Sequence, residues 1–170
     1  MILWKVLVMA NKYFNFRTVD KFLYNMNRKD CFDIMDMDGV TPNYKFVLCS
    51  ECNTDIEKCI DEDGTLMEWD STTGKGVQLL NTLGETDGLC PLLYSNGING
   101  EGTITVNATS VVYELTDDID YVKGIFLVSY GNGSGYVLAY SINNVPLEIQ
   151  DDTLILNVAG KIWGTHYAGA

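Results

Sequence analysis

Two strongly apolar segments joined by a glycine-rich turn constrain the fold of this chain more than any other feature. Residues 123 to 142 read KGIFLVSYGNGSGYVLAYSI, and the central GNGSG tolerates the positive φ angles of a hairpin loop. The stretch therefore predicts a β-hairpin. Its first arm, YVKGIFLVSY, is almost continuously apolar, which indicates that both faces of this strand are covered. One of these faces is a candidate for burial against another copy of the chain.

Short segments with strand-like patterns continue to the C-terminus. In GTITVNAT, residues 102 to 109, Ile104, Val106 and Ala108 alternate with polar residues, as in a half-buried strand. Turn residues separate such segments at intervals of roughly 8 to 12 residues. NNVP at 143–146 predicts one of these turns. The pattern predicts a mainly β fold, an antiparallel β-sandwich of jelly-roll type.

The composition of the chain changes near residue 95. All five Cys and most of the charged clusters lie before this point, together with a predicted helix on which Val19, Phe22 and Met26 share one apolar face. We therefore expect a mixed α/β N-terminal segment over residues 1–95 and a β-sandwich domain over residues 96–170. The sequence leaves open whether the N-terminal segment forms a separate domain or adds strands to the same sandwich.

The charge balance argues against two classes of partner. The chain has 23 acidic and 11 basic residues and a net charge of −12, so it would repel phosphate backbones, and we expect no nucleic-acid partner. No apolar run approaches the roughly 18 to 20 residues that span a membrane, so we expect no membrane partner. The opening MILWKVLVMA predicts a strand and not a signal peptide.

Cysteine residues form the first candidate site. Cys49 and Cys52 make a C-x-x-C motif, and Cys59 and Cys31 are available to complete a tetrahedral zinc site. However, the spacings match no standard zinc finger, and an odd number of Cys argues against a complete disulfide framework. The sequence favours reduced, unconnected thiols and no cofactor, as expected for a protein kept in cytoplasm. Structural zinc is the first alternative and a disulfide the second.

Other motifs fail in their details. The acidic loops DIMDMDGV and DEDGTLMEWD resemble calcium loops, but residues such as Cys59 and Lys45 fall at ligand positions, so we expect acidic surface turns. TTGKG resembles part of a phosphate loop, but Trp69 and Gly76 occupy positions that require Gly and Ser or Thr. The single histidine, His166, has no nucleophile motif around it. We therefore do not expect an enzyme.

Aromatic side chains are candidates for stacking on sugars or on a protein partner. The candidates are Trp69, Trp163, Tyr130, Tyr136 and Tyr140. Tyr136 and Tyr140 share one face of a predicted strand, and a position in the core is the favoured interpretation for them.

The C-terminal part of the chain resembles a known family. Three elements carry the likeness: a KG-x-FL strand, a Gly/Ser hairpin and a D-T-L step into the final strands. They comprise Lys123, Gly124, Phe126, Leu127, Gly133, Ser134, Gly135, Asp152, Thr153 and Leu154. Residues from about 100 to 170 resemble the C-terminal β-domain of small virion proteins of tailed bacteriophages. The resemblance implies a β-sandwich without catalytic residues that assembles into the particle as a decoration, fibre-base or neck component.

A capsid decoration (cement) protein is the leading prediction of function. Its partners would be the major capsid protein or other virion proteins, and we expect a homo-oligomer that is made in the host cytoplasm and works in the virion. We expect aromatic side chains of the N-terminal segment to anchor it, namely Trp4, Phe14, Phe16, Phe22 and Tyr24. The alternatives are a head–tail neck or fibre-base component, a carbohydrate- or receptor-binding module, and a small zinc-stabilised binding protein.

Overall fold

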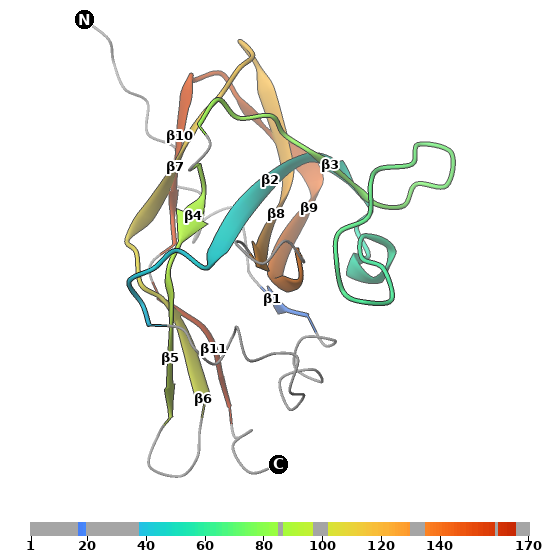
Figure 1. The fold of residues 1–170 in the computed structure, drawn as a ribbon. Coiled ribbons are helices and arrows are strands. Elements are labelled where there is room, and N and C mark those ends of the chain that lie inside the picture. The colour runs from blue at the N-terminus through green and yellow to red at the C-terminus, as the bar shows by residue number, and fades with distance from the viewer. Residues whose placement is uncertain are drawn as a thin grey trace, which may run out of the picture.

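The computed structural model describes residues 17–19, 38–84, 87–96, 102–129, 135–158 and 160–165. This part of the chain is mainly β, and its named strands pair antiparallel (Figure 1). Its helical content is the short 3₁₀ turn η2 (Ile56–Lys58), and no helix within the described ranges is long and apolar enough to cross a membrane. The helix predicted around Phe22 and Met26 lies outside the described residues.

The two predicted arms of the central hairpin are confirmed as strands. β8 (Asp120–Ser129) pairs antiparallel with β9 (Val137–Ile149). Ile125, Phe126 and Leu127 of β8 are completely buried, so both faces of this strand are covered, as its continuous apolar pattern predicted. Because the burial is complete within a single chain, the expectation that a second copy covers one face of β8 is wrong.

The largest sheet is built around this hairpin. Its strands run in the order β1 (Arg17–Thr18), β9, β8, β2 (Tyr44–Cys52) and β3 (Val77–Leu79), and β4 (Leu89–Cys90) also pairs with β2. In β2 the alternate residues Tyr44, Phe46 and Leu48 are buried, which is the period-two pattern of a strand with one core face. The short strand β3 lies at one edge of this sheet.

The remaining strands lie on the other side of the molecule in Figure 1. One sheet has the order β11 (Gly160–Thr165), β6 (Gly102–Val106) and β5 (Leu92–Asn96), and a second pairs β10 (Thr153–Asn157) with β7 (Ser110–Glu114). The N–H of Val158 donates to the carbonyl oxygen of Thr109 at 3.2 Å, which links the end of β10 to the start of β7. β7 follows β6 directly along the chain, and β11 follows β10, so the chain passes between these two sheets twice.

The turn predicted at NNVP is wrong, because β9 runs through residues 143–146 without reversing. Val122 of β8 is opposite Leu147, and Gly124 is opposite Ile142, so the extra residues of β9 form a bulge facing the single residue between them. A bulge accommodates Pro146, which has no N–H to donate to a neighbouring strand. Turn-forming residues thus lengthen a strand here and do not end it.

The core joins the two parts of the chain that the composition distinguishes. β2, from the N-terminal segment, pairs with β8, from the C-terminal segment, and the two share one set of buried side chains. The hydroxyl of Tyr113 in β7 donates to the carbonyl oxygen of Phe46 in β2 at 2.7 Å inside this core. Residues 44–52 therefore belong to the same core as β8.

Candidate functional site

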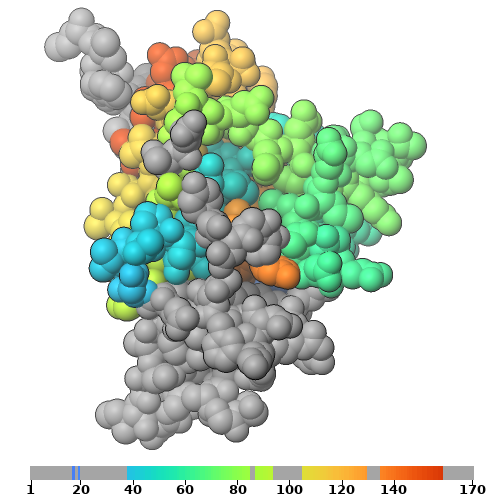
Figure 2. Space-filling model, in the orientation of Figure 1, coloured from blue at the N-terminus to red at the C-terminus, as the bar shows by residue number. Residues whose placement is uncertain are grey.

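The described part of the chain contains a groove beside β3 that is a candidate binding site. Its volume is about 480 Å³, within the range of roughly 300 to 1,000 Å³ that is usual for small-ligand sites. It belongs to the lobe formed by residues 53–84, which projects on the right in Figure 2. Its lining consists of Leu66, Met67, Glu68, Trp69, Val77, Gln78 and Leu79.

Backbone contacts at Gly76 hold the two walls of the groove together. Gly76 has a φ angle of +89°, and a Cβ atom at this position would lie 2.1 Å from the carbonyl oxygen of Glu68, so only glycine fits. The next residue, Val77, donates its N–H to the carbonyl oxygen of Met67 at 2.9 Å. Main-chain packing therefore holds the backbones of the two walls together.

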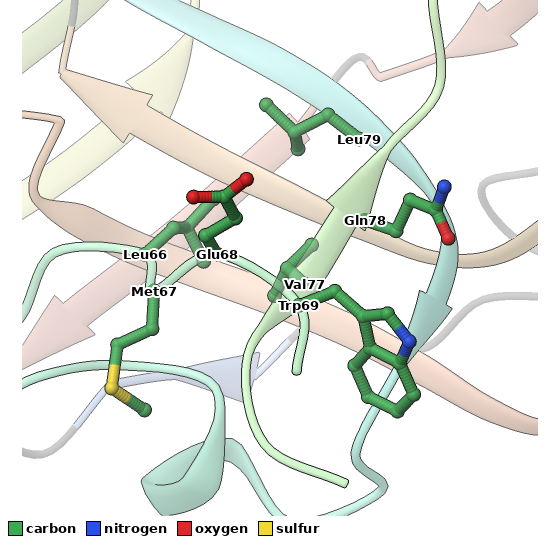
Figure 3. A pocket seen from close by; sticks show the side chains of 7 residues that line it. All are labelled: Leu66, Met67, Glu68, Trp69, Val77, Gln78 and Leu79. Atoms are coloured by element: carbon green, nitrogen blue, oxygen red, sulfur yellow. The ribbon is translucent and has the colours of Figure 1, made fainter. Parts of the chain in front are cut away.

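Apolar and polar groups are distributed on both sides of β3 within the groove. In Figure 3 the indole of Trp69 and the amide of Gln78 lie on one side, and the carboxylate of Glu68 and the side chain of Leu79 on the other. No described residue forms a hydrogen bond or ion pair with the side chains of Glu68, Trp69 or Gln78. The groove thus offers an aromatic surface, an acceptor and an amide that are all available to a ligand.

The structure separates the aromatic candidates suggested by the sequence. Trp69 lines the groove. Tyr136 is 41% exposed, and it lies near the groove because its backbone is bridged to Thr65, which directly precedes the lining residues 66–69. Tyr140 is only partly buried and packs against the core. Tyr130 and the side chain of Trp163 lie outside the described part of the chain. No local sequence pattern connects Trp69 with β3, because backbone contacts of Gly76 and Val77 bring them together.

A bulge in β2 gathers the cysteines of the C-x-x-C motif on one face. The pairing of β2 with β3 shifts at Ser50, and this extra residue places Cys49 and Cys52 on the same side, whereas a regular strand would put them on opposite sides. Glu51 points the other way, and its carboxylate accepts a hydrogen bond from the ammonium group of Lys123 at 2.7 Å.

Three thiols meet in the core opposite Gly124. A Cβ atom at Gly124 would lie 3.0 Å from the sulfur of Cys49 and 3.4 Å from that of Cys52, so a larger residue would displace both. A hydrogen bond with Cys49 raises the pKa of Cys52 to about 12, and the hydrogen bond with Cys52 also raises the pKa of Cys59. The thiols of Cys52 and Cys59 are therefore protonated near neutral pH and are poor nucleophiles.

The zinc hypothesis remains a prediction. Cys49, Cys52 and Cys59 lie near one another, while Cys31 lies outside the described residues. Among the described side chains, no group of three or more His, Cys, Asp or Glu is arranged to hold a metal ion. The four cysteines that the structure describes, these three and Cys90, are free thiols.

Thiol labelling measures the state of this cluster directly. We expect Cys49, Cys52, Cys59 and Cys90 to remain unmodified by iodoacetamide at pH 8 in the native protein and to react fully in denaturant, because each is at most 1% exposed. Peptide mapping by mass spectrometry locates the modified residues. Rapid native labelling of Cys52 or Cys59 would contradict the buried, protonated cluster, and protection that chelators remove would favour zinc.

The acidic loop that resembles a calcium site uses its carboxylate within its own turn. Asp61 accepts hydrogen bonds from the N–H groups of Asp63 and Thr65, at 3.0 and 2.9 Å, and from the hydroxyl of Thr65 at 2.6 Å. The hydroxyl contact is the main reason why the pKa of Asp61 is lowered. Asp70 caps its turn in a similar way, through Thr72 and Thr73. These contacts agree with the expectation of acidic surface turns.

Asp120 is an exception among the acidic residues, because it lies in the core. It is 3% exposed at the start of β8, and its Oδ2 atom has no hydrogen-bond partner in the described part of the chain. Burial, with a smaller contribution from the negative charge of Asp117, raises the pKa of Asp120. An ionised carboxylate therefore destabilises the fold at this position.

Replacing Asp120 by asparagine tests this directly. Because its folded-state pKa is above its unfolded value, the protonated form stabilises the fold below about pH 3.9, and this contribution is lost as the pH rises through the folded pKa. We expect the free energy of unfolding of Asp120→Asn, relative to that of the parent chain, to be higher at pH 7 than at pH 3.5. Denaturant unfolding at both pH values measures the difference, and an equal effect at both would contradict a buried carboxylate.

The predicted anchoring residues lie beyond the described structure. Trp4, Phe14, Phe16, Phe22 and Tyr24 all fall in segments whose placement is not described, so their role as an interface remains a prediction. Comparison of the chain with protein families, with curated proteins and with solved structures finds no match.

Proposed function

We propose that the chain is a non-enzymatic structural component of a tailed-bacteriophage virion, specifically a capsid decoration protein. The resemblance of residues from about 100 to 170 to small virion proteins supports this role. In the same proposal, the sheet containing β8 and β9 and the strands β5, β6, β7, β10 and β11 form the two layers of a jelly-roll-like antiparallel sandwich (Figure 1).

An exposed apolar strip on β7 and β10 is the observation that carries the proposal. Val112 of β7 is 46% exposed and is paired across the sheet with Ile155 of β10, which is half-buried. Leu83, which is 66% exposed, lies beside this strip, because its N–H donates to the carbonyl oxygen of Glu114 at 2.9 Å. Neighbouring apolar side chains with a polar rim are typical of protein–protein contact sites. A decoration protein holds capsid subunits through several such contacts, which gain strength by multivalency.

The test is binding to the phage particle. We expect purified virions of the encoding phage to contain the chain in a fixed ratio to the major capsid protein, and stripped heads to take it up again in a sedimentation assay. Val112→Glu should reduce this uptake at least about ten-fold, whereas Val40→Glu, at an exposed position away from the strip, should not. Absence of the chain from virions would contradict the proposal.

Copy number separates the related alternatives. A decoration protein is present at a number comparable with that of capsid subunits, whereas a neck or fibre-base component is present in few copies. Native mass spectrometry of the free chain gives its oligomeric state and any bound metal in the same measurement. A monomer that carries one zinc ion would favour the zinc-stabilised binding protein over a virion component.

A further inference from the structure

We propose that the groove between residues 66–69 and β3 binds a neutral oligosaccharide. This binding activity is separate from the virion role proposed above and does not rest on it. The inference rests on the combination of an available aromatic face, unpaired polar groups and a rigid backbone frame in one open groove.

The chemistry of the lining matches the two kinds of surface that a pyranose ring presents. One face of such a ring consists of C–H groups, which pack on an indole, and its rim carries hydroxyls that both donate and accept hydrogen bonds. Trp69 supplies the aromatic face, and Gln78, on the same side of β3, supplies both an acceptor and a donor. Glu68 offers a further acceptor on the other side of β3, within reach of another part of an oligosaccharide. None of these three side chains has a hydrogen-bond partner among the described residues, so a ligand would not have to displace an internal contact.

The groove is formed before any ligand arrives. Gly76 packs directly against the carbonyl of Glu68 and the N–H of Trp69, where a Cβ atom would lie 2.1 and 2.9 Å away. The turn between Trp69 and Gly76 is closed by the N–H of Asp70, which donates to the carbonyl oxygen of Lys75 at 2.8 Å. Since the frame is fixed, binding does not have to order the backbone, which favours affinity for a weakly held ligand.

Charge and backbone pairing argue against other ligands. A net charge of −12 and the carboxylate of Glu68 in the lining disfavour nucleotides and anionic glycans. An extended peptide would need the free edge of β3, but Val77 already donates its N–H to Met67 and is bridged to Glu68 on that edge. A neutral ligand that is recognised through hydroxyls and C–H groups is not repelled by the negative charge and does not need a free strand edge.

A second aromatic residue indicates a ligand longer than one sugar. Tyr136 is 41% exposed and is bridged to Thr65, four residues before Trp69 along the same wall. An extended chain of that length spans at most about 14 Å, which is the scale of a short oligosaccharide. We therefore expect affinity to rise from a monosaccharide to a hexasaccharide of the same sugar.

Titration of the full chain with a panel of neutral hexasaccharides tests the proposal. The probes are oligomers of glucose, N-acetylglucosamine, galactose and mannose, and the readout is the indole N–H resonance of Trp69 in ¹H–¹⁵N spectra, assigned with Trp69→Phe. We expect at least one probe to shift this resonance in a saturable way. We expect Trp69→Ala to weaken its binding at least about ten-fold and Glu68→Gln to weaken it less, while Trp69→Phe retains part of it.

The control is Tyr121→Ala, which removes an exposed aromatic side chain from β8 that does not line the groove. It should leave binding unchanged. The proposal is overturned if no probe shifts the Trp69 resonance, or if folded Trp69→Ala binds within two-fold of the parent chain. Should Trp69→Ala fail to fold, the resonance of the parent chain and the affinity of Trp69→Phe decide the matter.

Discussion

Replacing Gly88 by alanine is expected to lower the free energy of unfolding by about 3 to 5 kcal/mol. Gly88 has a φ angle of +78°, and an added Cβ atom would lie 2.2 Å from the carbonyl oxygen of Phe46. This carbonyl oxygen accepts a hydrogen bond from the hydroxyl of Tyr113, and the N–H of Phe46 donates to the carbonyl oxygen of Gly88 at 2.8 Å. The methyl group would therefore disturb two buried hydrogen bonds and strain the backbone at once.

Gly74→Ala is the matched control for this substitution. Gly74 also has a positive φ angle, +67°, but no other atom lies within 4 Å of the position that its Cβ would take. We expect it to cost only the backbone strain, about 1 kcal/mol. Urea denaturation followed by circular dichroism measures both variants. Equal losses would mean that the close approach of Gly88 to β2 does not contribute to stability.

Truncation of Phe126 to alanine has the second large expected effect, a loss of about 3 to 5 kcal/mol. Phe126 is fully buried in the middle of β8, between Val47 of β2 and Tyr140 of β9 in the sheet. Its removal leaves a cavity that the two flanking strands cannot fill without breaking their pairing. Unfolding in denaturant measures the loss.

Tyr121→Ala provides the comparison on the same strand. Tyr121 is 48% exposed, so its truncation should cost at most about 1 kcal/mol. If Phe126→Ala cost no more than this control, the core would not lie where β8 places it.

The strands were predictable from sequence where their pattern is strong and local. The apolar run of β8 and the alternation in β2 each indicate the strand and the face that it buries. The NNVP segment was not predictable, because its Asn and Pro residues are equally suited to a turn and to a bulge. Only the pairing with β8, set by residues far away in the chain, decides between the two.

The candidate sites depended even more on such distant contacts. The spacing of Cys49 and Cys52 would place them on opposite faces of a regular strand, and the bulge at Ser50 that reunites them is defined by β3. In the sequence, Gly76 belongs only to an incomplete phosphate-loop motif. In the structure it packs against the carbonyl of Glu68 and holds the two walls of the groove together, a contact that no local pattern predicts.

The pairing of β2 with β8 has a consequence for how the protein forms during synthesis. β2 ends at Cys52, whereas β8 begins at Asp120, so the ribosome releases β2 long before its partner exists. Folding that depends on such distant pairings is slow, and it leaves apolar strand edges open in the meantime. The nascent chain must therefore remain soluble through most of its translation, and the acidic residues that dominate its charge oppose association with its neighbours during that interval.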